Sequence, residues 1–138
     1  MYQIIEGKLA TEGIQQFSYQ FYSEGNYQPN QFTSSSWAVV DVRDLYNGNS
    51  FGNNNNNILE DYERKIDLAW EMMQKYGRVV ICCVAGTSRS NAIAIGVLVR
   101  YFKMPFDEAW KLVHYKVPIA DIHEVHITSL KELLGVAG

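Results

Sequence analysis

The side chains best suited to chemistry lie close together in this chain, between Ile81 and Ser90. Cys82 and Cys83 are the only two cysteines among the 138 residues, and a short turn containing glycine separates them from Arg89. A thiolate is a strong nucleophile, and the planar guanidinium of arginine can hold two oxygens of one phosphate. Cys83 and Arg89, six positions apart, therefore indicate nucleophilic chemistry on a phosphate group.

The segments on either side must position these residues. Val79 to Val84 is apolar and β-branched, which predicts a buried strand, and Ser90 to Phe102 is apolar nearly all round, which predicts a buried helix. A strand, a glycine-containing turn and a helix together direct N–H groups and the positive end of a helix dipole at an anion. We expect Cys83 at the base of this turn, and phosphate bound by Val84, Ala85, Gly86, Thr87, Ser88 and Arg89.

Strand and helix patterns alternate along the rest of the chain, which predicts an α/β fold with a central, mostly parallel sheet flanked by helices. The length of 138 residues suits a single compact domain, 1–138. A helix from Ile14 to Phe21 is one interpretation of an otherwise patternless segment, and Asn47 to Asn57 has the composition of a long loop. The remaining expected strands are Tyr2–Ala10, broken at Gly7, and Trp37–Val42; the remaining helices are Leu59–Met73, stopped near Gly77, Asp107–Tyr115 and Thr128–Leu134.

Composition limits the functional class. The net charge of −3 and the pI of about 5.6 disfavour nucleic acid and anionic membranes as partners. The longest apolar run, Ala92 to Val99, is too short to span a bilayer, and the first residues do not resemble a signal peptide. We therefore expect a cytoplasmic protein whose adjacent cysteines are not a disulfide framework.

The stretch Cys83–Ser90 resembles the C-x5-R-[ST] signature of cysteine-dependent protein tyrosine phosphatases. Ser88-Arg89-Ser90 is similar to the dual-specificity branch, and Gly86 falls where these enzymes have glycine. Cys82 does not fit this spacing, because it lies seven residues before Arg89. The resemblance covers Trp37 to Leu134 well and the first 36 residues weakly.

The resemblance implies a two-step hydrolysis of a phosphomonoester without metal or cofactor. Cys83 would attack phosphorus to form a phosphocysteine, and Arg89 with the turn would hold the phosphate oxygens. Ser90 would stabilise the thiolate when it leaves. The family usually has histidine immediately before the nucleophile, where this chain has Cys82, which we interpret as a small buried strand residue.

The family's general acid is an aspartate that follows a buried strand upstream. Asp44 occupies that place after Val39–Val42, so we predict Asp44 as the general acid and keep Asp41 as the alternative. When the following helix is used for alignment instead, the acid position falls near Gly52 or Asn53, which cannot donate a proton. A slow enzyme or a phosphate-binding relative would result.

Several other residues are interpreted from their position. Arg43 and Lys116 are candidates for the rim of the pocket, and a solvated surface side chain is the commoner alternative for both. His123 and His126 have a spacing that a metal site could use, but no further ligands lie near them in sequence, so solvated or structural roles are favoured.

The resemblance favours phosphoproteins as substrates, with phosphotyrosine first and phosphoserine or phosphothreonine next. No charged residue lies between Val84 and Ser88, which disfavours phosphoinositides. The alternatives are a non-catalytic phosphotyrosine-binding module, an RNA 5′-phosphatase and a rhodanese-like sulfur transferase. A low-molecular-weight phosphatase is disfavoured because enzymes of that family carry their catalytic cysteine near the N-terminus, whereas Cys83 lies well inside this chain. The sequence leaves the oligomeric state open.

Overall fold

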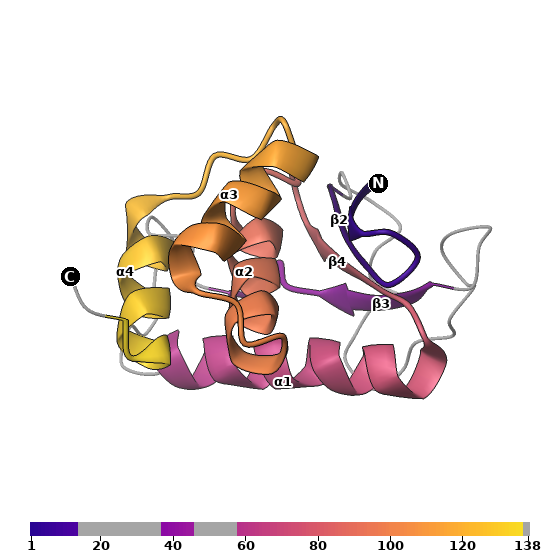
Figure 1. The fold of residues 1–138 in the computed structure, drawn as a ribbon, viewed down its shortest axis with the longest axis horizontal. Helices are drawn as coiled ribbons and strands as arrows, with labels where there is room; N and C mark the ends of the chain where they lie inside the picture. Colours follow the sequence, from indigo (N-terminus) through magenta and orange to yellow (C-terminus); the bar gives the residue numbers. More distant parts are fainter. Residues whose placement is uncertain (14–36, 46–57, 137–138) are drawn as a thin grey trace.

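The computed structural model describes residues 1–13, 37–45 and 58–136, and in these segments strands and helices alternate as expected (Figure 1). The predicted helix from Ile14 to Phe21 and the asparagine-rich loop lie outside the described residues. The elements in chain order are β1 (Tyr2–Ile5), β2 (Leu9–Gly13), β3 (Ala38–Asp41), α1 (Ile58–Tyr76), β4 (Val79–Cys83), α2 (Arg89–Tyr101), α3 (Phe106–Lys116) and α4 (Glu124–Leu134).

The four described strands form one mixed sheet in the order β1-β2-β4-β3. β1 and β2 are antiparallel, whereas β2 and β3 both run parallel to β4, so the predicted mostly parallel sheet is confirmed. Gly13 at the end of β2 lies opposite Cys83, and Asp41 at the end of β3 lies opposite Cys82. The carboxyl ends of three strands therefore meet at one edge, which is where ligands bind in open α/β sheets.

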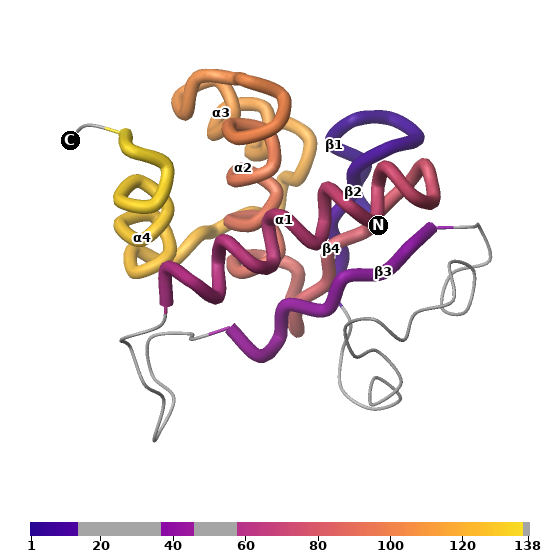
Figure 2. Tube along the Cα trace, turned by 90° about the horizontal axis from the view of Figure 1, so that it is seen from below, coloured from indigo at the N-terminus to yellow at the C-terminus, as the bar shows by residue number. Residues whose placement is uncertain are grey.

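The helices pack around α2, the central helix in Figure 1. α1 contacts β3 and β4, α2 contacts β4 and β2, and α3 contacts β1, while α4 packs against α1 and α2. α1 lies along the lower side of the molecule in Figure 1, and in Figure 2, seen from below, it crosses in front of α2 and β4. Because α2 is enclosed by the sheet and three helices, nearly all of its residues are buried, which explains its apolar sequence.

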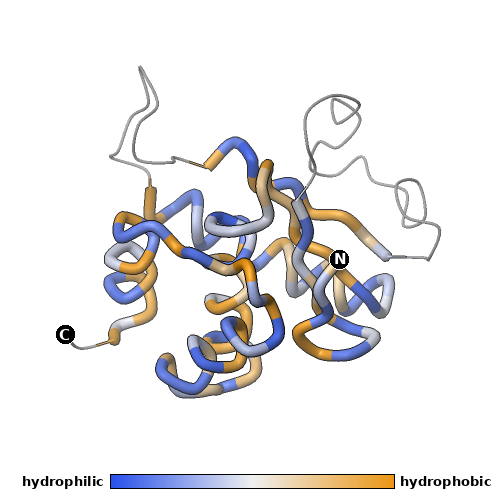
Figure 3. The backbone as a smooth tube through the Cα atoms, turned by 90° about the horizontal axis from the view of Figure 1, so that it is seen from above, coloured by the Kyte–Doolittle hydropathy of each residue, from blue (hydrophilic) through white to orange (hydrophobic). Residues whose placement is uncertain are grey.

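The outer helices follow their sequence patterns, and Figure 3 shows polar and apolar residues alternating along them. α1 buries Tyr62, Ile66, Ala69 and Met73 at helical spacing, and it ends before Gly77, whose φ of 88° suits a glycine. None of the helices in the described segments is long and apolar enough to cross a membrane.

Helix α4 begins four residues earlier than the sequence pattern predicts, at Glu124 rather than Thr128. Its first turn places His126 on the buried face, and Ser129 follows on the same face. Two polar residues on the inner face conceal the apolar period by which a helix is recognised in sequence. The helix end is marked by Gly135 in the left-handed conformation, whose N–H donates to carbonyls of the last turn.

Candidate active site

The turn between β4 and α2 comes into close contact with the end of β2. Gly86 has a φ of 77°, and a Cβ added there would lie 2.6 Å from the backbone nitrogen of Gly13. A Cβ on Gly13 would in turn lie 2.6 Å from both the carbonyl carbon and the oxygen of Ala85. Two glycines far apart in sequence thus allow backbone to touch backbone beneath the turn. Sequence reasoning identified Gly86 from the signature but missed Gly13.

Hydrogen bonds from outside fix the carbonyls of this turn. The Asn91 amide donates to the carbonyls of Gly86 and Thr87 at 3.0 Å each, and the Asp121 backbone N–H donates to the Thr87 carbonyl at 2.8 Å. A planar trans peptide directs its N–H opposite to its carbonyl. The N–H groups of Thr87 and Ser88 therefore point away from Asn91. The role of Asn91 could not be read from the sequence, where it is one polar residue in an apolar helix.

Cys83 lies at the base of a pocket of about 380 Å³ beside this turn. Its side chain is only slightly exposed, and its Sγ lies 3.2 Å from the hydroxyl oxygen of the fully buried Ser90. The signature thus brings together the thiol and the hydroxyl that it predicts as partners. The described residues that line the pocket are Cys83, Val84, Ala85, Thr87, Ser88, Arg89 and His123.

Arg89 begins α2 and lines the same pocket. Its guanidinium donates to the Arg43 carbonyl, and a second, longer bond of 3.4 Å reaches the Leu45 carbonyl. The side chain is therefore anchored to the segment that follows β3. A guanidinium has five N–H donors, so this anchoring leaves donors for an oxyanion.

The two candidate acids have different surroundings. Asp44 follows β3 with its side chain 62% exposed, and it pairs with the ammonium of Lys65 at 3.2 Å. Asp44 is not among the residues that line the Cys83 pocket. Asp41 is nearly buried and forms a bidentate pair with Arg43 at 2.7–3.0 Å. The Arg43 guanidinium turns back onto Asp41, and Arg43 is not among the described residues that line the Cys83 pocket.

Lys65 is a buried residue of α1 that the sequence pattern did not single out. Its side chain is 1% exposed, and its ammonium donates to the Asp41 carbonyl at 2.7 Å besides pairing with Asp44. A buried ammonium requires such partners. Lys65 therefore fixes the segment after β3 against α1, and with it the carbonyls that receive Arg89.

Two further residues that the sequence analysis considered, Cys82 and Lys116, are not among the described residues that line the pocket. Cys82 is completely buried in β4, as expected, and burial raises the pKa of its thiol, to which the charges of Glu12 and Asp41 add. Both cysteines are free thiols. Lys116 is exposed, lines another hollow with Met1 and Glu6, and is not among the described residues that line the Cys83 pocket.

The two closely spaced histidines have separate environments. His123 lines the pocket, whereas His126 is fully buried behind it. No group of three metal-ligating side chains is found in the described segments. His123 was read from sequence as solvated; it is exposed, but it also lies at the pocket, and neither motif nor periodicity signals this position.

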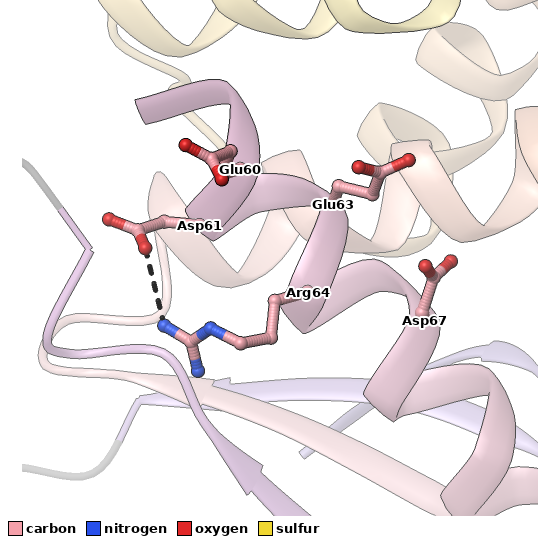
Figure 4. Close-up of a pocket in the computed structure, with 5 residues that line it drawn as sticks. All are labelled: Glu60, Asp61, Glu63, Arg64 and Asp67. Carbon is pink, nitrogen blue, oxygen red and sulfur yellow. Dashed lines mark hydrogen bonds and ion pairs between the residues drawn. The ribbon is translucent and has the colours of Figure 1, made fainter. Parts of the chain in front are cut away.

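A second hollow of about 420 Å³ lies on the surface of α1 (Figure 4). Its lining is mostly acidic, and Asp61 pairs with Arg64 at 3.4 Å. Its described lining contains no thiol and no residue that also lines the Cys83 pocket. Its other lining residues are Glu60, Glu63 and Asp67.

Comparison with known proteins agrees with this geometry. No family model matches the chain. The tyrosine-protein phosphatase vhp-1 of Caenorhabditis elegans is 33% identical over an alignment of 69 positions that covers 44% of this chain and 10% of that protein. The chain thus spans about a tenth of the length of this curated relative.

Two solved structures resemble the chain over almost its whole length. Human DUSP28 has a TM-score of 0.71 at 14% identity, covering 98% of this chain and 96% of that one. Tk-PTP, in its active form, has a TM-score of 0.68 at 17% identity, covering 99% and 97%. The resemblance predicted from the signature is thereby confirmed: this chain has the fold of the dual-specificity branch of the cysteine-dependent protein tyrosine phosphatase superfamily.

Proposed function

We propose that this protein hydrolyses phosphomonoesters on phosphoproteins through a phosphocysteine at Cys83. The observation that carries the proposal is the position of Cys83 Sγ, which lies 3.2 Å from Ser90 Oγ in a pocket that Arg89 and the turn also line. A nucleophile, an anion-binding turn and a fixed guanidinium are the parts that phosphoryl transfer to a thiolate needs. The family fold and the relative named tyrosine phosphatase support the same activity.

The proposed reaction balances in two steps. The Cys83 thiolate attacks phosphorus, so the S–P bond forms while the P–O bond to the leaving oxygen breaks, and that oxygen takes up a proton. Water then attacks the phosphocysteine and loses a proton, the S–P bond breaks, and the thiolate is restored. The Ser90 hydroxyl donates to the departing thiolate, while Arg89 and the N–H groups of the turn stabilise the phosphoryl oxygens.

Phosphotyrosine is the substrate class that the pocket favours. Val84 is 43% exposed at the pocket, and the turn itself carries no charged side chain before Arg89. An apolar rim suits an aryl ester, and the lack of additional cations disfavours polyphosphorylated lipids. The acidic net charge disfavours RNA 5′ ends. A cytoplasmic location and a single domain of residues 1–138 remain predictions.

The decisive assay is hydrolysis of p-nitrophenyl phosphate in the presence of EDTA. We expect turnover by the wild type and none by Cys83→Ser, because a hydroxyl at that position is a far weaker nucleophile. Cys82→Ala is the matched control, since it removes the neighbouring thiol and should retain turnover. Loss of turnover on EDTA treatment would contradict the proposed metal-free chemistry.

A non-catalytic phosphotyrosine-binding module is the second candidate. It is favoured by one observation: neither Asp44 nor any other carboxylate is among the described residues that line the pocket. Such a module would bind phosphate or vanadate through Arg89 yet show no turnover in the wild type. Hydrolysis of p-nitrophenyl phosphate would exclude it, because a good leaving group departs with little protonation.

A further inference from the structure

Among the described residues that line the pocket, His123 is the one that lies outside the signature. This residue precedes α4 and lies in the connection that follows α3. Its backbone N–H donates to the Ser88 hydroxyl at 3.0 Å, so the connection is joined directly to the phosphate-binding turn. A second bond, from Asp121 N–H to the Thr87 carbonyl, joins them again two residues earlier. The backbone at His123 is therefore held against the turn that carries Ser88 and Arg89.

The first chemical step requires a proton for the leaving oxygen, and few groups at the pocket can supply it. Arginine stays protonated in proteins, and the hydroxyls of serine and threonine are very weak acids. Asp44 lies outside the lining and is paired with Lys65, while Asp41 is held by Arg43. Imidazole is the side chain that gains and loses protons most readily near neutral pH. Among the described lining residues, only His123 combines this chemistry with the right place.

The buried residues behind His123 support its ring. The imidazole of His126 stacks against that of His123, with centroids 5.8 Å apart and an angle of 16°. His126 Nδ1 pairs with the hydroxyl of Tyr62, and its Nε2 has no hydrogen-bond partner in the described part of the chain. Burial lowers the pKa of His126 to about 4, with smaller contributions from the charges of His123 and Arg89. The buried ring is thus neutral near pH 7, and His123 faces no second cation from that side.

We propose that His123 is the proton-transferring residue of the pocket, acting on the leaving oxygen in the first step and on water in the second. Its imidazolium N–H gives a proton to the oxygen as the P–O bond breaks and the S–P bond forms. The resulting imidazole then accepts a proton from the water that displaces Cys83. This inference rests on the proposed phosphatase activity and replaces Asp44 in the acid's role.

The test compares two aryl phosphates across matched variants. Phenol is a poor leaving group, with a pKa of about 10 as in tyrosine, whereas p-nitrophenol is far more acidic and departs with little help. His123→Asn keeps the backbone bond to Ser88 and a residue suited to a helix N-cap. We expect it to lower kcat/KM for phenyl phosphate by about 10²–10⁴-fold and to affect p-nitrophenyl phosphate much less. Asp44→Asn should change kcat/KM for both substrates by the same factor, and His114→Asn, on α3, should leave kcat/KM for both unchanged.

The outcomes separate the inference from the function on which it rests. A selective loss with phenyl phosphate in Asp44→Asn but not in His123→Asn would return the acid's role to Asp44 and overturn the inference alone. An equal loss on both substrates in His123→Asn, with the unfolding midpoint unchanged and the same result in His123→Gln, would also overturn it. Absence of turnover in the wild type with p-nitrophenyl phosphate would remove both proposals together.

Discussion

The contact between Gly13 and the turn between β4 and α2 yields a quantitative prediction for a residue outside the signature. In Gly13→Ala the new Cβ would lie 2.6 Å from the carbonyl carbon of Ala85, whereas ordinary contact begins near 3.4 Å. Both sides of this contact are backbone, so no side chain can rotate away. The turn or the end of β2 must therefore shift by about 0.8 Å. A displacement of that size beside a nucleophile can lower the rate by ~10²-fold.

The matched control is the same substitution at Gly7, in the turn between β1 and β2. Gly7 has a φ of 75° and no atom within 4 Å of an added Cβ, so the substitution introduces backbone strain without a clash. Both variants should lose about 1–3 kcal/mol of unfolding free energy in urea titrations. Only Gly13→Ala should also lose most of its hydrolysis of p-nitrophenyl phosphate and its affinity for vanadate. Equal activity and affinity in the two variants would show that the turn does not depend on Gly13.

Two further predictions concern the packing behind the site. Gly96→Ala should destabilise the fold by about 1–3 kcal/mol, because its Cβ would lie 2.7 Å from Cγ1 of Ile66 and still closer to Cδ1. Ile66→Val removes Cδ1, so urea titrations of the double variant should recover part of the loss; strict additivity would contradict the contact. For His126, burial lowers the folded-state pKa to about 4 from an unfolded value of 6.5. The unfolded chain binds more protons between these values, so stability should fall as the pH drops from about 6.5 to about 4. His126→Phe should flatten this part of the pH dependence of the unfolding free energy, and an unchanged slope would exclude His126 as its source.

The sequence predicted the parts of the site that are contiguous along the chain. Cys83, Gly86, Arg89 and Ser90 occupy one strand, one turn and one helix, so local spacing and the periods of the flanking segments determine their relative positions. The fold class followed from the alternation of strand and helix patterns. Both predictions depend on residues that are close together in sequence, and the observed order of strands and helices matches them.

The parts supplied by distant segments were not predictable. Gly13 contacts the turn through strand pairing, and His123 reaches it through two hydrogen bonds from the α3–α4 connection. Neither contact leaves a periodic or compositional trace in the sequence. The partner of Arg43 was likewise not predicted from the sequence: its guanidinium pairs with the carboxylate of Asp41, two residues away.

The bonds that tie the carbonyls of Gly86 and Thr87 to Asn91 and Asp121 affect the entropy of ligand binding. A loop that orders only around its ligand loses conformational freedom at that moment, at about 1–2 kcal/mol for each residue fixed. Here the donors are the chain's own Asn91 and Asp121, so the loss occurs when the chain folds. An oxyanion entering the pocket therefore meets donors already in place, and its affinity carries little cost for ordering the turn.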